Sequence, residues 1–581
     1  MRYARIGMAQ VAFCALLGAL AGCPPGNPSG GGNGNRNGPS NANTTANANL
    51  NLNLNVNMNA STPEERGRVI YQGQRCINCH GFDGSGSPIF PGAPNIIGRT
   101  ADNLRTALVE DCPPPPAGSA LDNCHPLKLR DLSQQQLDDL AAYLATLTPT
   151  VPRDPGPPCD NVPGNICTIA GNGVQGNQVV SGTILARDQF LFWPQNVTLD
   201  PQGRVVITDW NNYLIRRIEN TDCTNGDCPI VNIIGTSGLG DSCSTAAMPV
   251  PAINATMNHP VGVLYDDLGN IILWGWHQWK IKYIPVNADG TTGLMYCLFG
   301  NGRGAGAENI AAGFGVTTMV GGVARMTTFN LPSSCVYDNA GNFYISDQAN
   351  LRIRIVEADA DDNNTSAEMF VQSRLNNNIR TFAGGLVDAS GNFRHTLLDY
   401  SDSGDGGPAA MCTFNVQAGF DAVPQMRMAL DRARNLLYVA DSENNRVRVI
   451  DLNTNIITTY AGGGNDLVAD NVPATQAKLF RPADVDLDPG GSGDLLVTDT
   501  FNHCVRLVDF GTQTIRTVAG TCGPTEGAYA GDGGAATAAK LYEPGGSYLA
   551  DDPNDPNSYT VYIADTLNHR VRRVNAVPKN P

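Results

Sequence analysis

The sequence predicts a multi-domain protein in which a small all-α domain precedes a large all-β domain built from repeated units. Three observations predict this arrangement. Helical patterns flank a cysteine motif within residues 61–150, a Pro-rich linker follows over 151–164, and residues 165–581 repeat one strand-rich pattern. A chain of 581 residues exceeds one ordinary domain, so two or three are expected.

Composition argues against two classes of partner. The formal net charge of −16 is the opposite of the basic surface that a nucleic-acid-binding protein needs. The same charge argues against electrostatic attachment to anionic lipid. No run of 18 apolar residues occurs, so no membrane-spanning helix is expected. Sixteen cysteines indicate an oxidising compartment.

The N-terminus is predicted to be a secretory signal peptide over 1–22. Two early arginines precede an apolar run over 11–20, which is too short to span a bilayer. The run ends in Leu-Ala-Gly-Cys23, which is similar to the lipobox of bacterial lipoproteins. The resemblance implies a lipid on Cys23 and, because Pro24 follows rather than Asp, an outer-membrane lipoprotein facing the periplasm or the cell surface. Ordinary signal cleavage beside an incidental cysteine is the alternative.

Residues 23–60 comprise the predicted lipidated cysteine and a tether. The segment 24–60 is rich in Asn, Gly and Pro, a composition typical of disorder. The alternating Asn residues over 47–59 could instead support weak aggregation. A flexible chain of this length spans about 30–35 Å, enough to hold a folded domain off a membrane.

The motif Cys76-Ile-Asn-Cys79-His80 has the C-x-x-C-H pattern of covalent haem attachment. Two thiols at this spacing reach both vinyl groups of one porphyrin, and the adjacent imidazole becomes the proximal ligand of the iron. A chance C-x-x-C pair or half of a zinc site would explain the residues more simply. Together with its flanking helices, the motif predicts one covalently bound haem c.

Two predicted helices, over 62–71 and 132–147, flank this motif. The whole segment 63–147 resembles a small class I cytochrome c domain. The resemblance implies that Pro94 supports the proximal imidazole through its carbonyl group. It also implies that the terminal helices cross where Gly67 allows close approach to Tyr143.

The sixth iron ligand departs from the cytochrome pattern. No methionine occurs between residues 59 and 247, and Cys124-His125-Pro126 stands where Met-Pro is expected. His125 is therefore the candidate distal ligand, and bis-His ligation would lower the potential relative to His/Met ligation. A five-coordinate iron, or an iron bound by another group, is the alternative.

The C-terminal region repeats the motif D-x-x-N-x-x-[IV]-R between residues 165 and 574. Each copy follows an apolar-x-Pro segment and a turn, and period-two alternation predicts antiparallel strands. A T-x-A-G motif marks a fourth strand, and the first such strand, near 165–171, is expected to complete the last sheet and close a ring. Five full copies and one degenerate copy begin at Asp209, Asp347, Asp441, Asp499, Asp565 and Gly275.

This pattern resembles NHL repeats, and the resemblance implies an all-β six-bladed NHL-type β-propeller over 165–581. The motif Asp is expected to accept backbone hydrogen bonds, the Asn to take a left-handed conformation, and the Arg to point outward towards an acid of the next blade. These are scaffold roles. The Gly-rich loops over 403–407 and 531–534 lack the full spacing of a calcium or phosphate site and are assigned to the scaffold too.

The second repeat differs most from the pattern. Trp274, Trp276, His277 and Trp279 gather three of the five tryptophans of the chain. Such a cluster could line a ligand site or form a docking surface for the haem domain. A degenerate blade packed with bulky side chains is an equally good explanation.

Twelve cysteines remain once Cys23, Cys76 and Cys79 are modified and the signal peptide is removed. Local spacing predicts four disulfides: Cys112–Cys124, Cys159–Cys167, Cys223–Cys228 and Cys504–Cys522. No partner can be assigned from the sequence to Cys243, Cys297, Cys335 or Cys412.

These features favour a membrane-anchored c-type cytochrome that transfers electrons to an unidentified redox partner protein, with the propeller as a docking or ligand-binding platform. The sequence favours an electron carrier over an enzyme. One alternative is a propeller that oxidises a substrate, as in quinoprotein dehydrogenases, and passes electrons to the haem. Another is a surface interaction protein.

Overall fold

A computed structural model describes the chain within its C-terminal part. The chain divides into two compact units, residues 1–151 and 152–581. The described residues all belong to the second unit: 159, 162–176, 184–220, 228–244, 248–300, 329–358, 379–384, 404–416, 423–465 and 470–579. The predicted signal peptide, tether and haem domain therefore lie outside the described residues.

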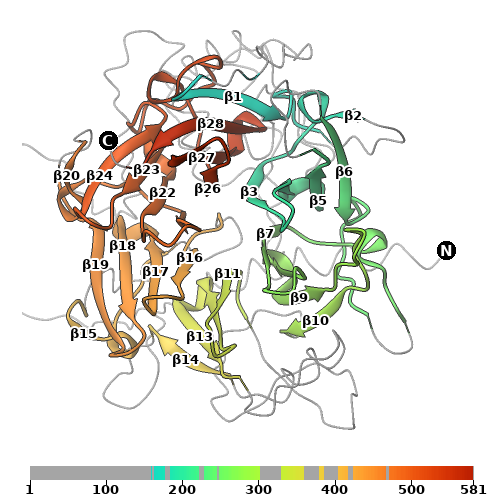
Figure 1. Cartoon of the computed structure of the whole chain (residues 1–581). Helices are drawn as coiled ribbons and strands as arrows, with labels where there is room; N and C mark the ends of the chain where they lie inside the picture. Colours follow the sequence, from blue (N-terminus) through green and yellow to red (C-terminus); the bar gives the residue numbers. More distant parts are fainter. Residues whose placement is uncertain are drawn as a thin grey trace, which may run out of the picture. The chain divides into compact units, whose positions relative to one another are not determined.

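The described residues form six antiparallel sheets arranged as blades around a ring (Figure 1). The first strand of each blade contacts the first strand of the next blade, and the sixth blade contacts the first. This is a six-bladed β-propeller, as the repeats predict. No helix among the described residues is both long enough and apolar enough to cross a membrane.

Each blade has four main strands, which follow one another from the inner to the outer edge. Blade 1 comprises β3 (Pro194–Leu199), β4 (Val205–Asp209), β5 (Leu214–Ile218) and β6 (Pro229–Ile234). Blade 2 comprises β7 (Pro260–Tyr265), β8 (Ile271–Gly275), β9 (Lys280–Ile284) and β10 (Tyr296–Phe299). Blade 3 comprises β11 (Pro332–Tyr337), β12 (Phe343–Asp347), β13 (Arg352–Val356) and β14 (Ile379–Ala383).

The last three blades follow the same order. Blade 4 comprises β16 (Met428–Asp431), β17 (Leu436–Asp441), β18 (Arg446–Asp451) and β19 (Ile456–Gly462). Blade 5 comprises β21 (Asp484–Leu487), β22 (Leu495–Asp499), β23 (Cys504–Val508) and β24 (Thr514–Ala519). Blade 6 comprises β26 (Gly546–Asp552), β27 (Asp555–Asp565), β28 (Arg570–Pro578) and, from the start of the domain, β1 (Asn165–Ala170).

Strand β1 completes the last sheet, as the repeat pattern predicts. It pairs with β28, with Ile166 opposite Val574, and so removes an open edge (Figure 1). The repeat pattern does not predict the short fifth strands that border four of the sheets. These are β2 (Ile184–Leu185), β15 (Gly407–Pro408), β20 (Val472–Pro473) and β25 (Gly534–Ala535).

Two sets of one-turn 3-10 helices connect the strands. The first set lies at the repeat motif between the second and third strands, which is D-x-x-N in every blade except blade 2: η4 (Trp210–Asn212), η6 (Trp276–Gln278), η7 (Gln348–Asn350), η9 (Ser442–Asn444), η11 (Thr500–Asn502) and η13 (Thr566–Asn568). The second set lies in the loops that precede a blade: η3 (Ala186–Asp188), η5 (Ala252–Asn254), η8 (Ala409–Met411), η10 (Ala474–Gln476) and η12 (Ala536–Ala538).

Apolar side chains fill the interfaces between neighbouring blades. One cluster joins blades 2 and 3 through Ile272, Tyr283, Phe299, Phe343 and Ile345, all of them buried. Similar clusters occupy the other interfaces, because the strands alternate side chains between the two faces of each sheet. Every sheet therefore has both faces covered, which explains the nearly continuous burial of the second and third strands.

A buried arginine links four of the blades near the centre of the ring. Arg427 precedes β16 and donates hydrogen bonds through Nη1 to the carbonyl oxygens of Gln195 (2.9 Å) and Gly545 (3.1 Å). Its guanidinium also lies 3.5 Å from the carboxylate of Asp484. Burial lowers the pKa of Arg427, while Asp484 opposes that shift. This side chain satisfies backbone carbonyls that the inner strands leave without a ladder partner.

Three disulfides join described cysteines. Cys159–Cys167 and Cys504–Cys522 are two of the pairs that local spacing predicts. Cys243 pairs with Cys297, a partner that the sequence did not reveal. Cys228 is also disulfide-bonded, but Cys223, like Cys112 and Cys124, lies outside the described residues. Cys335 and Cys412 are free and buried.

Candidate functional site

The repeat motif forms a buried polar cluster in the regular blades. In blade 1, Asp209 accepts hydrogen bonds from the backbone N–H of Phe192 (2.7 Å), from Asn212 Nδ2 (2.8 Å) and from Arg216 Nε (2.7 Å). All three motif side chains are buried. The carboxylate thus ties the motif turn to the segment before the first strand and neutralises the arginine.

Two sequence-based expectations about this motif are wrong. The motif arginine does not point outward towards the next blade: Arg216 and Arg448 are buried and pair with Asp209 and Asp441 of their own blades. The buried carboxylate attracts the nearest cation, and that cation lies on the adjacent strand. The left-handed residue is not the motif Asn but its successor, as at Tyr213, because the Asn belongs to the 3-10 helix and binds the Asp.

The Gly-rich loops contribute to the same scaffold. Asp405 lies 2.5 Å from Arg448 and also accepts a hydrogen bond from Thr459 Oγ1. Asp532 pairs in the same way with Arg572 and accepts a hydrogen bond from Thr168 Oγ1 (2.6 Å). Both carboxylates are therefore engaged by protein groups, in agreement with their assignment to the scaffold.

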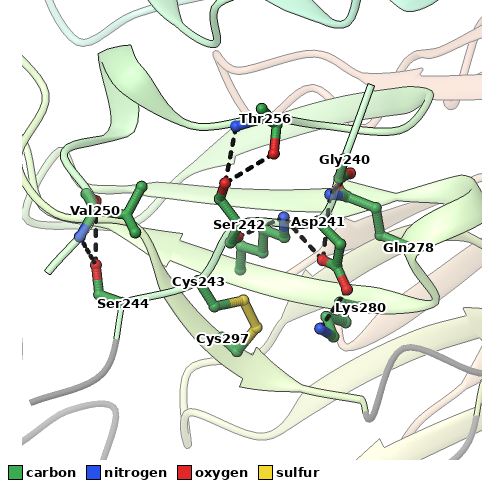
Figure 2. The surroundings of a disulfide bond; sticks show 11 residues. Gly240, Asp241, Ser242, Cys243, Ser244, Val250, Thr256, Gln278, Lys280 and Cys297 are labelled. Atoms are coloured by element: carbon green, nitrogen blue, oxygen red, sulfur yellow. Dashed lines mark hydrogen bonds and ion pairs between the residues drawn. A yellow bond between two sulfur atoms is a disulfide. The ribbon is translucent and has the colours of Figure 1, made fainter. Parts of the chain in front are cut away.

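Blade 2 lacks this cluster and replaces it with groups from a preceding loop. Gly275, Gln278 and Lys282 stand at the positions of Asp, Asn and Arg. Figure 2 shows Asp241 beside Gln278 and Lys280: its carboxylate lies 3.3 Å from Gln278 Nε2 and 2.5 Å from Lys280 Nζ. Lys282 Nζ, fully buried, donates to the Ser242 carbonyl (3.0 Å) and lies 3.5 Å from Asp241.

The loop that carries Asp241 is fixed at several points. The disulfide between Cys243 and Cys297 joins it to β10, and Ser242 hydrogen-bonds Thr256 (Figure 2). Burial lowers the pKa of Lys282 to about 8, and Asp241 opposes that shift. Asp241 thus pairs with both Lys280 and Lys282, whereas the other blades have a motif acid and an arginine at this turn.

The predicted aromatic cluster of blade 2 divides between the core and the surface. Trp274 and Trp276 are buried in the cluster that joins blades 2 and 3, so they fill the interior. His277 and Trp279 are only partly buried. Trp279 is the left-handed residue that ends the 3-10 turn. Two of the four side chains are therefore part of the core, and the other two are partly exposed.

His277 instead meets a histidine that sequence reasoning did not select. Its Nδ1 lies 2.9 Å from Nδ1 of His259, which directly precedes β7. Strand pairing explains the contact, because Pro260 lies opposite Gly275 and so brings the residues beyond both strand ends together. The sequence alone gave little reason to select His259. It occupies the position of Trp193 in blade 1, directly before the proline that begins the first strand.

Aromatic rings surround this histidine pair. The ring centroid of His259 lies 4.5 Å from that of Trp210 and 5.2 Å from that of Tyr213. Trp193 stacks on Trp210 at 5.9 Å. The packed rings hold the imidazole of His259 in one orientation.

Both imidazoles favour the neutral form. Burial lowers the pKa of His277 to about 4. Burial also lowers the pKa of His259 well below its ordinary value, and the neighbouring His277 adds to the shift. Near neutral pH the pair therefore offers lone pairs rather than positive charge.

A cavity of about 330 Å³ lies elsewhere, between blades 1 and 2. Its arginines are already paired with acids of the protein: Arg204 with Asp200 (2.7 Å), and Arg217 with Glu219 (2.8 Å). The cavity thus offers no free cation to an anionic ligand, and it does not include the histidine pair.

The haem-binding residues predicted from the sequence lie outside the described residues: Cys76, Cys79, His80, Pro94 and His125, together with the lipidation candidate Cys23. The segment that contains the five haem-binding candidates, but not Cys23, is covered by a family model. Residues 64–148 match the family model described as cytochrome c. These residues form a cytochrome c domain. The domain implies covalent haem c, and two thiols followed by an imidazole in C-x-x-C-H order are the donors that this group requires.

The chain is similar to curated proteins that include an NHL repeat-containing protein. NHL repeat-containing protein 2 of Gallus gallus is 31% identical over 162 residues, which cover 27% of this chain and 21% of that protein. Protein SUPPRESSOR OF QUENCHING 1, chloroplastic, of Arabidopsis thaliana is 30% identical over 150 residues, which cover 24% of this chain and 12% of that protein. The chain therefore matches only a minor part of the length of either relative.

Similarity to solved structures is more distant. A structural genomics protein of unknown function from Bacteroides thetaiotaomicron aligns over 70% of this chain and 75% of its own, with 13% identity and a TM-score of 0.42.

Proposed function

We propose that this protein is an electron-transfer cytochrome, held at the outer membrane by a lipid on Cys23, that uses its propeller as a platform for a redox partner or ligand. The match of residues 64–148 to cytochrome c, on a segment containing Cys76-Ile-Asn-Cys79-His80, carries the proposal. The group implied by this match supplies a one-electron carrier when bound.

Five residues are assigned to binding the haem. Cys76 and Cys79 would form the two thioether links, and His80 would bind the iron. Pro94 would support the His80 imidazole through its carbonyl oxygen. His125 would supply the sixth ligand, which would exclude small ligands and favour electron transfer over substrate chemistry at the iron.

The test of this proposal is the absorption spectrum of the reduced holoprotein with and without carbon monoxide. A haem band that does not move on adding the gas supports a closed, six-coordinate iron. The H125A variant is expected to open that position and shift the band. A shift already present in the wild-type protein would remove His125 as a ligand and favour ligand sensing or catalysis at the iron.

The number of haem groups is tested separately. Pyridine haemochrome analysis is expected to give one haem per chain, and none bound covalently in a C76S/C79S variant. Two haems per chain, or covalent haem in the double variant, would contradict the assignment of one site.

The acidic charge of the chain favours a basic redox partner. Electron exchange with a cationic inorganic oxidant, such as a cobalt complex, should therefore slow as salt is added, because screening removes the attraction. Exchange with an anionic oxidant such as ferricyanide should accelerate. The opposite pair of trends would indicate a basic surface around the site of exchange.

Anchoring is tested by fractionation of cells that produce the chain. The wild-type protein is expected in the outer-membrane fraction, and the C23S variant in a soluble or mislocalised form. Equal distribution of the two proteins would contradict lipidation at Cys23.

A further inference from the structure

Nδ1 of His259, at the start of the first strand of blade 2, contacts two other polar atoms. Nδ1 of His259 lies 2.6 Å from Oδ1 of Asn258 and 2.9 Å from Nδ1 of His277. Asn258 and His259 precede β7, whereas His277 lies in η6 (Trp276–Gln278). We propose that Asn258, His259 and His277 bind a first-row transition-metal ion, with copper as the preferred ion.

In the metal-free protein, one proton must serve both contacts of His259 Nδ1. A neutral imidazole has one N–H and one lone pair. A proton on His259 Nδ1 must be shared between the Asn258 oxygen and His277. A proton on His277 Nδ1 points at His259 and leaves the lone pairs of His259 and Asn258 facing each other at 2.6 Å. Reversing the Asn258 amide makes its N–H compete with His277 for one lone pair.

A metal ion resolves this competition because it accepts a lone pair from each of the three atoms. Ions bound by imidazole lie about 2.0–2.1 Å from the nitrogen. Two nitrogens 2.9 Å apart can both meet that distance, with an angle of about 90° at the metal. The neutral state of both imidazoles is the state that binds metals.

The donor set indicates which ion is preferred. Two neutral imidazoles and an amide oxygen carry no net charge, and no group of three His, Cys, Asp or Glu side chains forms a metal cluster anywhere in the described part of the chain. A neutral, nitrogen-rich site suits copper and zinc rather than calcium or magnesium, and copper binds most tightly in the divalent series. Three protein donors leave at least one position for water or another ligand.

Comparison with the other blades shows that this pair is specific to blade 2. The residues that precede the first strands and share the left-handed conformation of His259 are Trp193, Leu331, Met426, Arg481 and Glu543. The residues equivalent to His277 at the middle of the 3-10 turn are Asn211, Ala349, Glu443, Phe501 and Leu567. The propeller fold therefore does not require histidine at either position.

This comparison also provides the variants for the test. H277A copies the residue of blade 3, and H259L copies blade 3 at the other position, so both changes suit the local backbone. The matched control is H503N. His503 accepts the backbone N–H of Glu543 (3.1 Å), and Asn445 does the same for Arg481 (2.9 Å) at the equivalent position, so Asn can replace His503 without loss of that bond.

The experiment is a copper titration of the full-length holoprotein after removal of metals with a chelator. Electron paramagnetic resonance counts the bound Cu²⁺ and the nitrogen atoms coupled to it. The wild-type protein and H503N are expected to bind one equivalent of Cu²⁺ with two imidazole nitrogens. H277A is expected to lose that equivalent or bind it at least tenfold more weakly, and H259L and N258A are expected to weaken it too.

The proposal is overturned if H277A, with unchanged circular dichroism, binds the same number of copper equivalents with the same nitrogen couplings as the wild type. The two histidines would then be a hydrogen-bonded pair only. If H259L does not fold, H277A alone decides. Binding of zinc in the absence of copper binding would overturn the choice of copper. Copper sites at the haem ligands or at Cys335 and Cys412 are unaffected by H277A, so they cannot imitate the expected loss.

Discussion

Blade 4 and blade 2 stabilise the same turn of the repeat in different ways. In blade 4, Asp441 accepts hydrogen bonds from the Asn415 backbone (2.9 Å), from Asn444 (3.0 Å) and from Arg448 (3.3 Å), so the turn contains its own acid. In blade 2, Gly275 stands where the motif acid would be. The buried cation Lys282 is paired instead with Asp241 from a separate loop. In both blades the buried cation beside this turn has an acidic partner, but that acid comes from a different part of the sequence.

The second difference between the two blades is covalent. The loop that carries Asp241 is joined to β10 by Cys243–Cys297. Cys412, in the corresponding loop region before blade 4, is a free buried thiol. We therefore expect blade 4 to depend most on its motif acid, and blade 2 to depend most on its disulfide.

The largest expected effect comes from D441A, which removes the acid of blade 4. Both Asp441 and Arg448 are fully buried, so the change leaves a buried guanidinium with one acid in place of two. Loss of one partner from a buried pair costs about 3–5 kcal/mol. Denaturant unfolding followed by near-ultraviolet circular dichroism measures the loss.

A surface pair supplies the control for this prediction. R380A breaks the exposed pair with Glu357 and should cost less than about 1 kcal/mol. If D441A prevents folding, D441N preserves the volume and should still be clearly less stable than R380A. Equal stability of D441N and R380A would contradict a special role for the motif acid.

The next effect concerns the blade 2 disulfide. C243A/C297A opens a loop of 54 residues and should reduce the free energy of unfolding by about 2–4 kcal/mol. C159A/C167A opens a loop of only 8 residues and should cost about 1–2 kcal/mol less, because a shorter loop restricts the unfolded chain less. Calorimetry of the two double variants tests the order. A larger loss for the shorter loop would show that the loop holding Asp241 does not need the link.

A smaller effect is expected when blade 2 is given the motif acid. A β-carbon on Gly275 would overlap the side chain of Gln278, which must move, so G275D should destabilise the blade by about 1 kcal/mol through overpacking. The triple variant G275D/Q278N/K282R restores the cluster of the other blades and should recover most of that loss. Melting temperatures of the three proteins measure the recovery. If the triple variant is the least stable, the two arrangements cannot be exchanged.

The smallest effect is a pH dependence. The folded-state pKa of Lys282 is lowered to about 8 from an ordinary 10.5, so the unfolded chain binds more protons between these values and stability rises with pH. The contribution from pH 7.5 to 9 is about 1 kcal/mol. The difference in unfolding free energy between wild type and K282M, measured at both pH values, should change by this amount in favour of the wild type. Parallel curves would contradict the shift.

The sequence predicted the parts of the propeller that repeat. Five copies of the Asp-Asn-Arg motif located the turns, and the position of the first T-x-A-G strand predicted that β1 would join the last sheet. Repetition makes these features recognisable because the same residues recur at the same spacing in each copy. The two-residue outer strands gave no such signal, since their pairing depends on the neighbouring sheet and not on their own residues.

The histidine pair and the Asp241 loop could not be predicted for a different reason. His259 and His277 meet because β7 pairs with β8 in one register, and Asp241 reaches Lys282 across a separation of 41 residues. Both contacts are set by packing in three dimensions. In the predicted haem site, by contrast, Cys76, Cys79 and His80 lie within five consecutive residues, so a motif was enough to predict these three donors.

Ring closure by β1 has a consequence for the order of folding. Residue 166 is synthesised long before its partner, residue 574. Strand β1 therefore cannot pair with β28 until the sixth blade has been synthesised. Blades 1–5 pair only strands close in sequence and can form in turn, whereas the last sheet requires the two ends of the domain to meet. During synthesis the first strand is thus an open edge, and the short disulfide Cys159–Cys167 limits how freely it moves. A chain that lacks blade 6 would retain that edge and be prone to self-association.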